Sequence, residues 1–299
     1  MIKNTKILNI LVVILSVIFA LNIFVPIMSS GANSSAGDQT TGGTTIDDEP
    51  FIPIDQPTND KSDETPVTFT AEQLIEKAVS YINGDISCKS TANGTVKTNV
   101  KVVGDITQKV YTSIQRDTQG HRLCFNASVK SATIGVTVGR QTYTDGGTVY
   151  YREAKTVSDS FVATYNDGWN RMSESEYFNE FGLIPGNSYY NIDKSSILEY
   201  SKLQMGSTGY RCTIKLDPAS QTAYIRNVEV MSGSSTRPVV KYINLTFITD
   251  LDGVPSRVAA EECYVITVMG FTATCTNSVT TKYTNWGKYF AIQRPNGVK

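Results

Sequence analysis

Histidine and closely spaced cysteine pairs are scarce in this chain. His121 is the single histidine among 299 residues, and the five cysteines form no CxxC pair. Zinc sites draw on several His or Cys ligands, and a serine triad needs a histidine base that a carboxylate orients. We therefore expect no catalytic residue, no metal site and no cofactor, and we interpret the chain as a non-enzyme.

A large excess of one charge is also absent. The chain carries 27 basic and 28 acidic side chains. Without Lys3, Lys6, Lys61 and the eight acidic residues of segment 29–67, 24 basic and 20 acidic side chains remain. No basic cluster accompanies this mild excess, so nucleic acid is not an expected partner.

Long apolar runs are lacking except for one, at residues 7–28, which follows Lys3 and Lys6. A membrane-spanning helix needs about 20 apolar residues, and preceding lysines favour a cytoplasmic N-terminus. We expect a single-pass membrane anchor with the remaining domain outside the membrane. The alternative is a signal peptide cleaved near Ser30-Gly31-Ala32, which would make the protein secreted. No cysteine lies near the end of the run, which excludes anchoring through a lipid-modified cysteine.

The chain divides into four parts at these features. Residues 1–6 are the expected cytoplasmic N-terminus, 7–28 the anchor, 29–68 a disordered acidic linker and 69–299 an extracytoplasmic β-rich domain. The linker is rich in Ser, Gly, Thr and Pro and has eight acidic residues against one basic residue. Such a segment buries too little apolar surface to offset its ordering entropy, so we expect a solvated spacer.

The domain opens with a helix pattern and continues with strand patterns. Thr70 and Gln73 have capping-box spacing, Gly84 follows the last turn, and apolar residues over 74–82 share one face. Two further helices are expected at 173–181 and at 217–231, although the β-branched residues of the second segment favour a strand. Strands are expected at 94–103, 109–115, 121–127, 135–143, 148–153, 161–165, 197–204, 209–215, 239–249, 256–267 and 271–284. The fold class is α+β and mostly antiparallel: a curved sheet or half-barrel packed on the N-terminal helix.

This layout, and the stretch Lys241 to Ser256 (KYINLTFITDLDGVPS), resemble the LolA-like envelope proteins of bacteria, including the LppX-type lipoproteins. The stretch has that family's strand, acidic-glycine turn and following strand with proline. The resemblance implies a half-barrel that holds acyl chains or another apolar ligand. The chain departs from the lipoproteins because it lacks a lipidated cysteine.

Three local patterns invite a chemical interpretation. Asp250, Asp252 and Glu261 suggest calcium, but the spacing fails the EF-hand pattern, and Asp and Gly here are typical of a hairpin turn. A three-residue loop at 268–270 would place Cys263 opposite Cys275, close enough for a disulfide, with two buried thiols as the alternative. The aromatic residues Tyr150, Tyr151, Trp169, Tyr189 and Tyr190 suggest either a binding surface or filled strand faces.

Two functions from different classes remain open, with an enzyme as a third. The first is a membrane-tethered binding domain that holds a lipid-like or apolar ligand between the sheet and the helix at 70–82. The second is a structural or interaction module that docks a wall component or a partner protein and has no small-molecule pocket. A hydrolase with paired carboxylates could use Glu174, Glu176 or Glu180, but their helix pattern indicates a solvated face.

Overall fold

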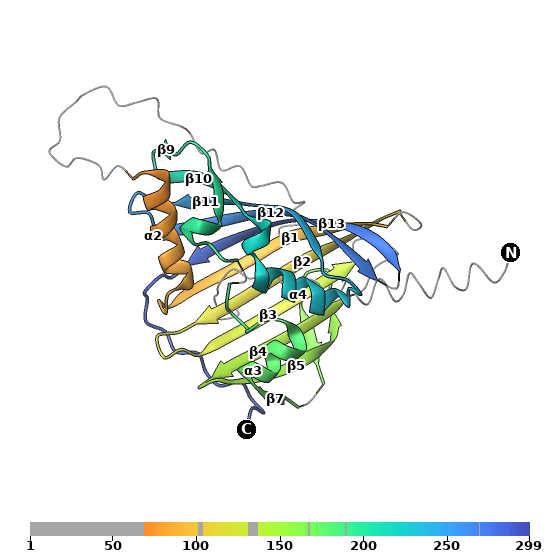
Figure 1. Cartoon of the computed structure of the whole chain (residues 1–299). Coiled ribbons are helices and arrows are strands. Elements are labelled where there is room, and N and C mark those ends of the chain that lie inside the picture. Colours follow the sequence, from red (N-terminus) through yellow and green to blue (C-terminus); the bar gives the residue numbers. More distant parts are fainter. Residues whose placement is uncertain (1–68, 101–103, 131–136, 167, 189, 269) are drawn as a thin grey trace, which may run out of the picture.

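The computed structural model in Figure 1 describes residues 69–299 except 101–103, 131–136, 167, 189 and 269. The expected anchor (7–28) and linker (29–68) lie outside the described residues and stay predictions. Among the helices that are described, none is both long enough and apolar enough to cross a bilayer.

The described strands form one open, curved antiparallel sheet (Figure 1). Its order is β6-β5-β4-β3-β2-β1-β13-β12-β11-β10-β8, with β7 added to β5 and β9 to β10. The strands are β1 Cys88–Val100, β2 Gly104–Arg116, β3 Arg122–Lys130, β4 Val138–Asp145, β5 Thr148–Val157, β6 Ala163–Tyr165, β7 Asn170–Ser173, β8 Ile197–Tyr200, β9 Gln204–Gly206, β10 Gly209–Leu216, β11 Val239–Thr249, β12 Pro255–Val268 and β13 Phe271–Thr284. The pairing of β1 with β13 joins the two ends of the domain in the middle of the sheet.

The predicted N-terminal helix is confirmed as α2, Ala71–Asn83. Thr70 accepts from the backbone N–H of Gln73, and the Gln73 side chain accepts from the N–H of Thr70, so the capping box is complete. Gly84 ends the helix. The helix contacts β10, β11 and β12, which places it over one end of the sheet.

Two further helices cover the same face of the sheet, as Figure 1 shows. The predicted helix 173–181 is confirmed as α3, Glu174–Phe181, with Ser173 as its N-cap. The predicted helix 217–231 is present but starts differently: η2, Pro218–Ser220, is a 3₁₀ turn, and α4 runs from Thr222 to Ser232. A second 3₁₀ turn, η1, covers Lys194–Ser196. We call the face that these helices cover the inner face.

The predicted hairpins and closing meander are confirmed, with changes at some strand ends. Turns at 117–120 and 145–147 join β2 to β3 and β4 to β5. The first strand begins at Cys88 rather than at residue 94. The strand expected at 197–204 is split into β8 and β9, because Ser201 inserts its hydroxyl into the ladder and accepts from the N–H of Thr213.

Two apolar clusters hold the domain together. The larger lies between the helices and the inner face, and includes Leu74 and Ile75 of α2 with Phe247 of β11. The smaller lies on the outer face, where Ile292 of the C-terminal tail packs on Tyr143 and Tyr150. The tail therefore acts as a strap across the outer face of β4 and β5.

Candidate functional site

The space between α2 and the sheet, where the sequence placed an apolar ligand, is filled by the protein's own side chains. Leu74 is 0% and Ile75 is 1% exposed, and Ala78 and Ile82 are equally buried. They pack on apolar residues of the inner face in the main core. These side chains occupy the space directly beneath the helix, where an acyl chain would have to displace them.

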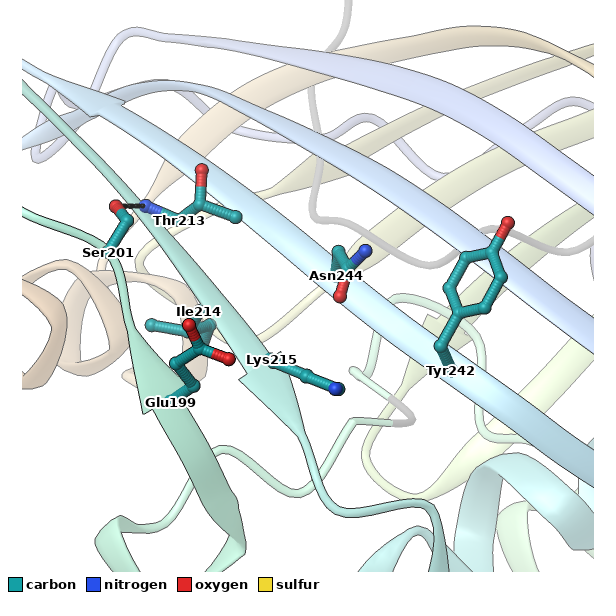
Figure 2. Close-up of a pocket in the computed structure, with 7 residues that line it drawn as sticks. All are labelled: Glu199, Ser201, Thr213, Ile214, Lys215, Tyr242 and Asn244. Atoms are coloured by element: carbon teal, nitrogen blue, oxygen red, sulfur yellow. Dashed lines mark hydrogen bonds between the residues drawn. The ribbon is translucent and has the colours of Figure 1, made fainter.

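A polar groove lies on the outer face near the sheet edge, and Figure 2 shows its lining. Its volume is about 410 Å³. Side chains from the β8 segment, β10 and β11 line it: Glu199, Ser201, Thr213, Ile214, Lys215, Tyr242 and Asn244.

Strand alternation explains why polar residues line this groove. Cys212, Ile214 and Leu216 of β10 belong to the inner core, so Thr213 and Lys215 point to the opposite face. The register sets Lys215 directly opposite Glu199 on β8 and Asn244 on β11. Three strands therefore present a cation, an anion and an amide in one row.

The edge of the groove is fixed by hydrogen bonds between Ser201 and Thr213. The N–H of Ser201 donates to the carbonyl of Thr213 at 2.8 Å, and the N–H of Thr213 donates to the Ser201 hydroxyl at 2.8 Å. Thr213 also shares a hydroxyl hydrogen bond of 2.8 Å with Thr246 of β11. The walls are thus held in place by the ladder.

The two charges of the groove remain available to a ligand. Within the described part of the chain, neither Glu199 nor Lys215 takes part in an ion pair or a side-chain hydrogen bond. The phenol of Tyr242 lies beyond them and has its pKa raised, mainly by burial. The groove can bind polar groups of either charge and can donate to or accept from hydroxyl groups.

A second polar group lies on the inner face. Glu262 of β12 is 2% exposed, and its carboxylate accepts hydrogen bonds from Tyr190, from Tyr224 at 2.7 Å and from Asn277 at 2.9 Å. Burial raises the pKa of Glu262 to about 7, although the hydrogen bond from Asn277 lowers it. The sequence interpretation missed this residue. The alternation along β12 could have identified it, because Glu262 falls on the same buried face of the strand as the core residues Ala260 and Tyr264.

His121 lies between two carboxylates, with 22% of its side chain exposed. Its Nδ1 is 2.9 Å from Asp117, and its Nε2 is 3.6 Å from Asp145. The Asp117 side chain also accepts from the N–H of Ile292 at 3.0 Å. Both ring nitrogens face carboxylates, and Asp117 is itself bonded to the C-terminal strap, so the geometry favours a structural role.

The interpretation of Asp250 and Asp252 as a hairpin turn is confirmed. Asp250 accepts from the N–H of Asp252 at 3.0 Å and from that of Val254 at 2.9 Å. Gly253 has φ +77°, the left-handed conformation that glycine adopts readily. Glu261 lies in the middle of β12, away from this turn.

The predicted register of Cys263 and Cys275 is wrong by one residue. Val268 pairs with Phe271, so the connecting loop has two residues, and Cys275 stands opposite Tyr264 while Cys263 stands opposite Thr276. Adjacent residues of a strand point to opposite faces, so the two thiols lie on different sides of the sheet. Within the described residues, neither Cys263 nor Cys275 forms a disulfide.

Of the acidic residues of α3, Glu176 lines a pocket of about 300 Å³, and the described residues that line this pocket include no second carboxylate. Glu176 completes the capping box with Ser173, and the hydrogen bonds from Ser173 lower its pKa. Glu180 is exposed. Among the described residues, Glu262 is the carboxylate with a strongly raised pKa, and no second carboxylate converges on it.

The aromatic residues that the sequence singled out mostly fill the interior. Tyr150 and Tyr190 are buried, and Tyr151 is partly buried against the core. Trp169 donates its indole N–H to the carbonyl of Asn296 in the C-terminal strap at 3.1 Å. Tyr189 lies outside the described residues.

Comparison with known proteins gives weak structural likenesses only. No family model and no curated protein matches the chain. Similar solved structures include a LolA superfamily protein from Nitrosomonas europaea, at 8% identity over 76% of this chain and 96% of that one with a TM-score of 0.25. A putative outer membrane lipoprotein-sorting protein domain from Vibrio parahaemolyticus is 9% identical over 73% of this chain and 92% of that one, with a TM-score of 0.26. Rv2717c from M. tuberculosis is 8% identical over 69% of this chain and 95% of that one, with a TM-score of 0.23. A member of the LolA superfamily, the family named from the sequence, is therefore among these weakly similar structures. Neither the identities nor the TM-scores extend it to a ligand or an activity.

Proposed function

We propose that this protein is a membrane-tethered, extracytoplasmic binding module whose outer groove docks a polar component of the cell wall. The tethered binding module comes from the first function expected from the sequence and the wall ligand from the second, which was expected without a small-molecule pocket. The observation that supports it most is the row of Glu199, Lys215 and Asn244 across three strands, with both charges unpaired among the described residues.

The chemistry of the groove indicates a class of ligand. An unpaired carboxylate and an unpaired ammonium suit a ligand that carries both an amine and a carboxylate, and Ser201, Tyr242 and Asn244 suit its hydroxyl and amide groups. A disaccharide-peptide fragment of the wall combines all of these groups. The volume of about 410 Å³ is within the range of small-molecule sites.

The filled space beneath α2 favours this function over an apolar ligand in that place. Leu74 and Ile75 would have to leave the sheet before an acyl chain could enter. Anchoring by residues 7–28 and spacing by residues 29–68 are part of the proposal, and so is the absence of catalysis. The linker would hold the groove away from the bilayer, within reach of wall polymer.

Calorimetric titration of the full chain in detergent with soluble disaccharide-peptide wall fragments tests the proposal. We expect binding that Lys215→Ala or Glu199→Gln weakens at least tenfold, because each removes a charge that forms a charge-assisted hydrogen bond to the ligand. Lys109→Ala, an exposed lysine of β2 far from the groove, is the matched control and should bind like the wild type.

Mass spectrometry of organic extracts of the same purified protein tests the alternative, which is that the protein binds a lipid. A stoichiometric co-purified lipid, together with no binding of wall fragments, would overturn the proposal in favour of an apolar ligand. Wall-fragment binding that is unaffected by both groove variants would show that the groove is not the site.

A further inference from the structure

Glu262 is a buried carboxylate without a cationic partner. It is 2% exposed on the inner face of β12, and none of the ion pairs among the described residues includes it. Removing an ionised carboxylate from water is costly unless an opposite charge compensates it. Its neighbours supply neutral hydrogen-bond donors instead.

The donors come from three separate elements. Tyr190 lies in the segment before η1, Tyr224 in α4 and Asn277 directly opposite Glu262 on β13. Both tyrosine hydroxyls donate to the carboxylate, one to each oxygen. Glu262 is therefore the point at which two covering elements are bonded to the sheet.

These two covering elements are also bonded to each other. The Gln221 side chain accepts from the N–H of Asn191 at 2.9 Å and donates to the Asn191 carbonyl at 3.0 Å. The rings of Tyr190 and Tyr224 stack with centroids 5.6 Å apart. We call residues 190–196 together with α4 the cover, because these contacts join them into one unit on the inner face.

We propose that Glu262 is a proton-dependent latch: its neutral carboxyl group holds the cover on the sheet, and its ionisation loosens the cover. An ionised Glu262 regains water only if the cover lifts, whereas a neutral one loses little by staying buried. Lifting the cover would expose Asn277, directly opposite Glu262, and would withdraw Tyr190 and Tyr224 from the main core.

The phenols of Tyr224 and Tyr264 and the thiol of Cys275, which surround Glu262, titrate above the pH range in which Glu262 does. Burial holds the pKa values of Tyr224 and Tyr264 well above normal and raises that of Cys275 to about 12. Ile243, opposite on β11, is apolar. The charged residues of the cover itself lie at its surface: Asp193, Lys194, Arg226 and Glu229.

The direction of the pH dependence follows from the raised pKa. The carboxyl group of Glu262 has a pKa of about 7 in the closed state, against an ordinary value of 4.5 when it is exposed to water. Proton linkage therefore stabilises the closed cover fully below about pH 4.5, and this stabilisation is lost as the pH rises to about 7. The opening constant should rise by up to tenfold per pH unit across this window and level off above it.

Hydrogen exchange of the full chain in detergent, followed by mass spectrometry at pH 5, 6, 7 and 8, tests the latch. After correction for the intrinsic exchange rate, peptides of 190–196 and 222–232 should open at least tenfold more at pH 7 than at pH 5. Glu262→Gln keeps a neutral group of the same shape and should abolish this rise. Glu261→Gln removes the exposed carboxylate next in the strand and should leave the rise unchanged.

A second variant protects the test against a folding defect in the first. Tyr190→Phe removes a hydrogen-bond donor to the ionised carboxylate and so raises the pKa of Glu262 further. The pH above which the opening constant stops rising should therefore be higher than in the wild type. The latch is wrong if the wild-type peptides show no pH dependence or if Glu262→Gln keeps it. It is also wrong if peptides of β1 and β2 open to the same extent, because the transition is then global unfolding.

Discussion

The guanidinium group of Arg116, on β2, donates a hydrogen bond to the carbonyl oxygen of Ile82 in the last turn of α2. It also donates to the carbonyls of Tyr81 at 3.3 Å and Ile86 at 2.9 Å. The last carbonyls of a helix have no partners within the helix, and α2 has no basic residue in its last turn. A buried arginine of the sheet supplies the missing donors and favourable charge, and so fixes the helix to the sheet.

Replacement of Arg116 by methionine should destabilise the domain by about 3 kcal/mol. Three carbonyls near the end of α2 would lose a charged donor in a buried position, and each unsatisfied buried group costs roughly 1–3 kcal/mol. Urea unfolding followed by tryptophan fluorescence measures this loss. Arg237→Met removes an exposed arginine and should change the stability by less than about 0.5 kcal/mol. Equal losses in the two variants would contradict the capping role.

The stability of Glu262→Gln relative to the wild type should depend on pH. Because burial raises the pKa of Glu262 from 4.5 to about 7, the wild type gives up stability as the pH rises through this range. The variant should match the wild type near pH 4.5 and exceed it by up to about 3 kcal/mol at pH 8. Unfolding midpoints of both proteins at several pH values measure the difference, and a constant difference would rule out the titration of Glu262.

Replacement of Asp117 by asparagine should loosen the C-terminal strap. Asp117 accepts from the N–H of Ile292 and from His121, and these hydrogen bonds lower its pKa although burial raises it. This stabilisation is present above the ordinary aspartate pKa of 3.8 and is lost as the pH falls below it. Limited trypsin digestion at pH 7.5 should cleave after the exposed Lys288 several times faster in the variant.

Asp145→Asn is the control for this digestion. Asp145 contacts His121 at 3.6 Å but, among the described residues, does not hydrogen-bond to the strap. Cleavage after Lys288 should therefore stay near the wild-type rate. Comparable acceleration in both variants would show that His121, rather than Asp117, holds the strap.

Cys263 should be the first thiol to react with a maleimide in the native protein. It is half-buried, whereas Cys88, Cys124, Cys212 and Cys275 are 0–1% exposed. Burial also raises the pKa values of Cys124 and Cys275 to about 12, so these thiols do not form the reactive thiolate. Intact-mass analysis under non-reducing conditions should show one fast label and four that require denaturant. Only three reactive thiols after denaturation would indicate a disulfide.

Local patterns determined most of the secondary structure. The capping box at Thr70 and Gln73 and the glycine after the helix specify α2 without any tertiary contact. Turn residues at 117–120 and 250–253 specify hairpins, because Asp side chains accept from nearby backbone N–H groups and glycine tolerates the left-handed conformation. Alternation then assigned each strand a buried and an exposed face.

The sites depended on contacts between residues far apart in the chain, which local patterns do not contain. One residue more or less in the loop after Val268 decides whether Cys263 or Tyr264 faces Cys275. The sequence around Glu262 does not predict its contacts with Tyr190 and Tyr224, because those residues lie in the cover, far from β12 in the chain. Likewise, Glu199, Lys215 and Asn244 form a row only because three antiparallel strands pair in one register. Sequence alone determined which segments become helices and strands, and tertiary packing decided which polar side chains meet.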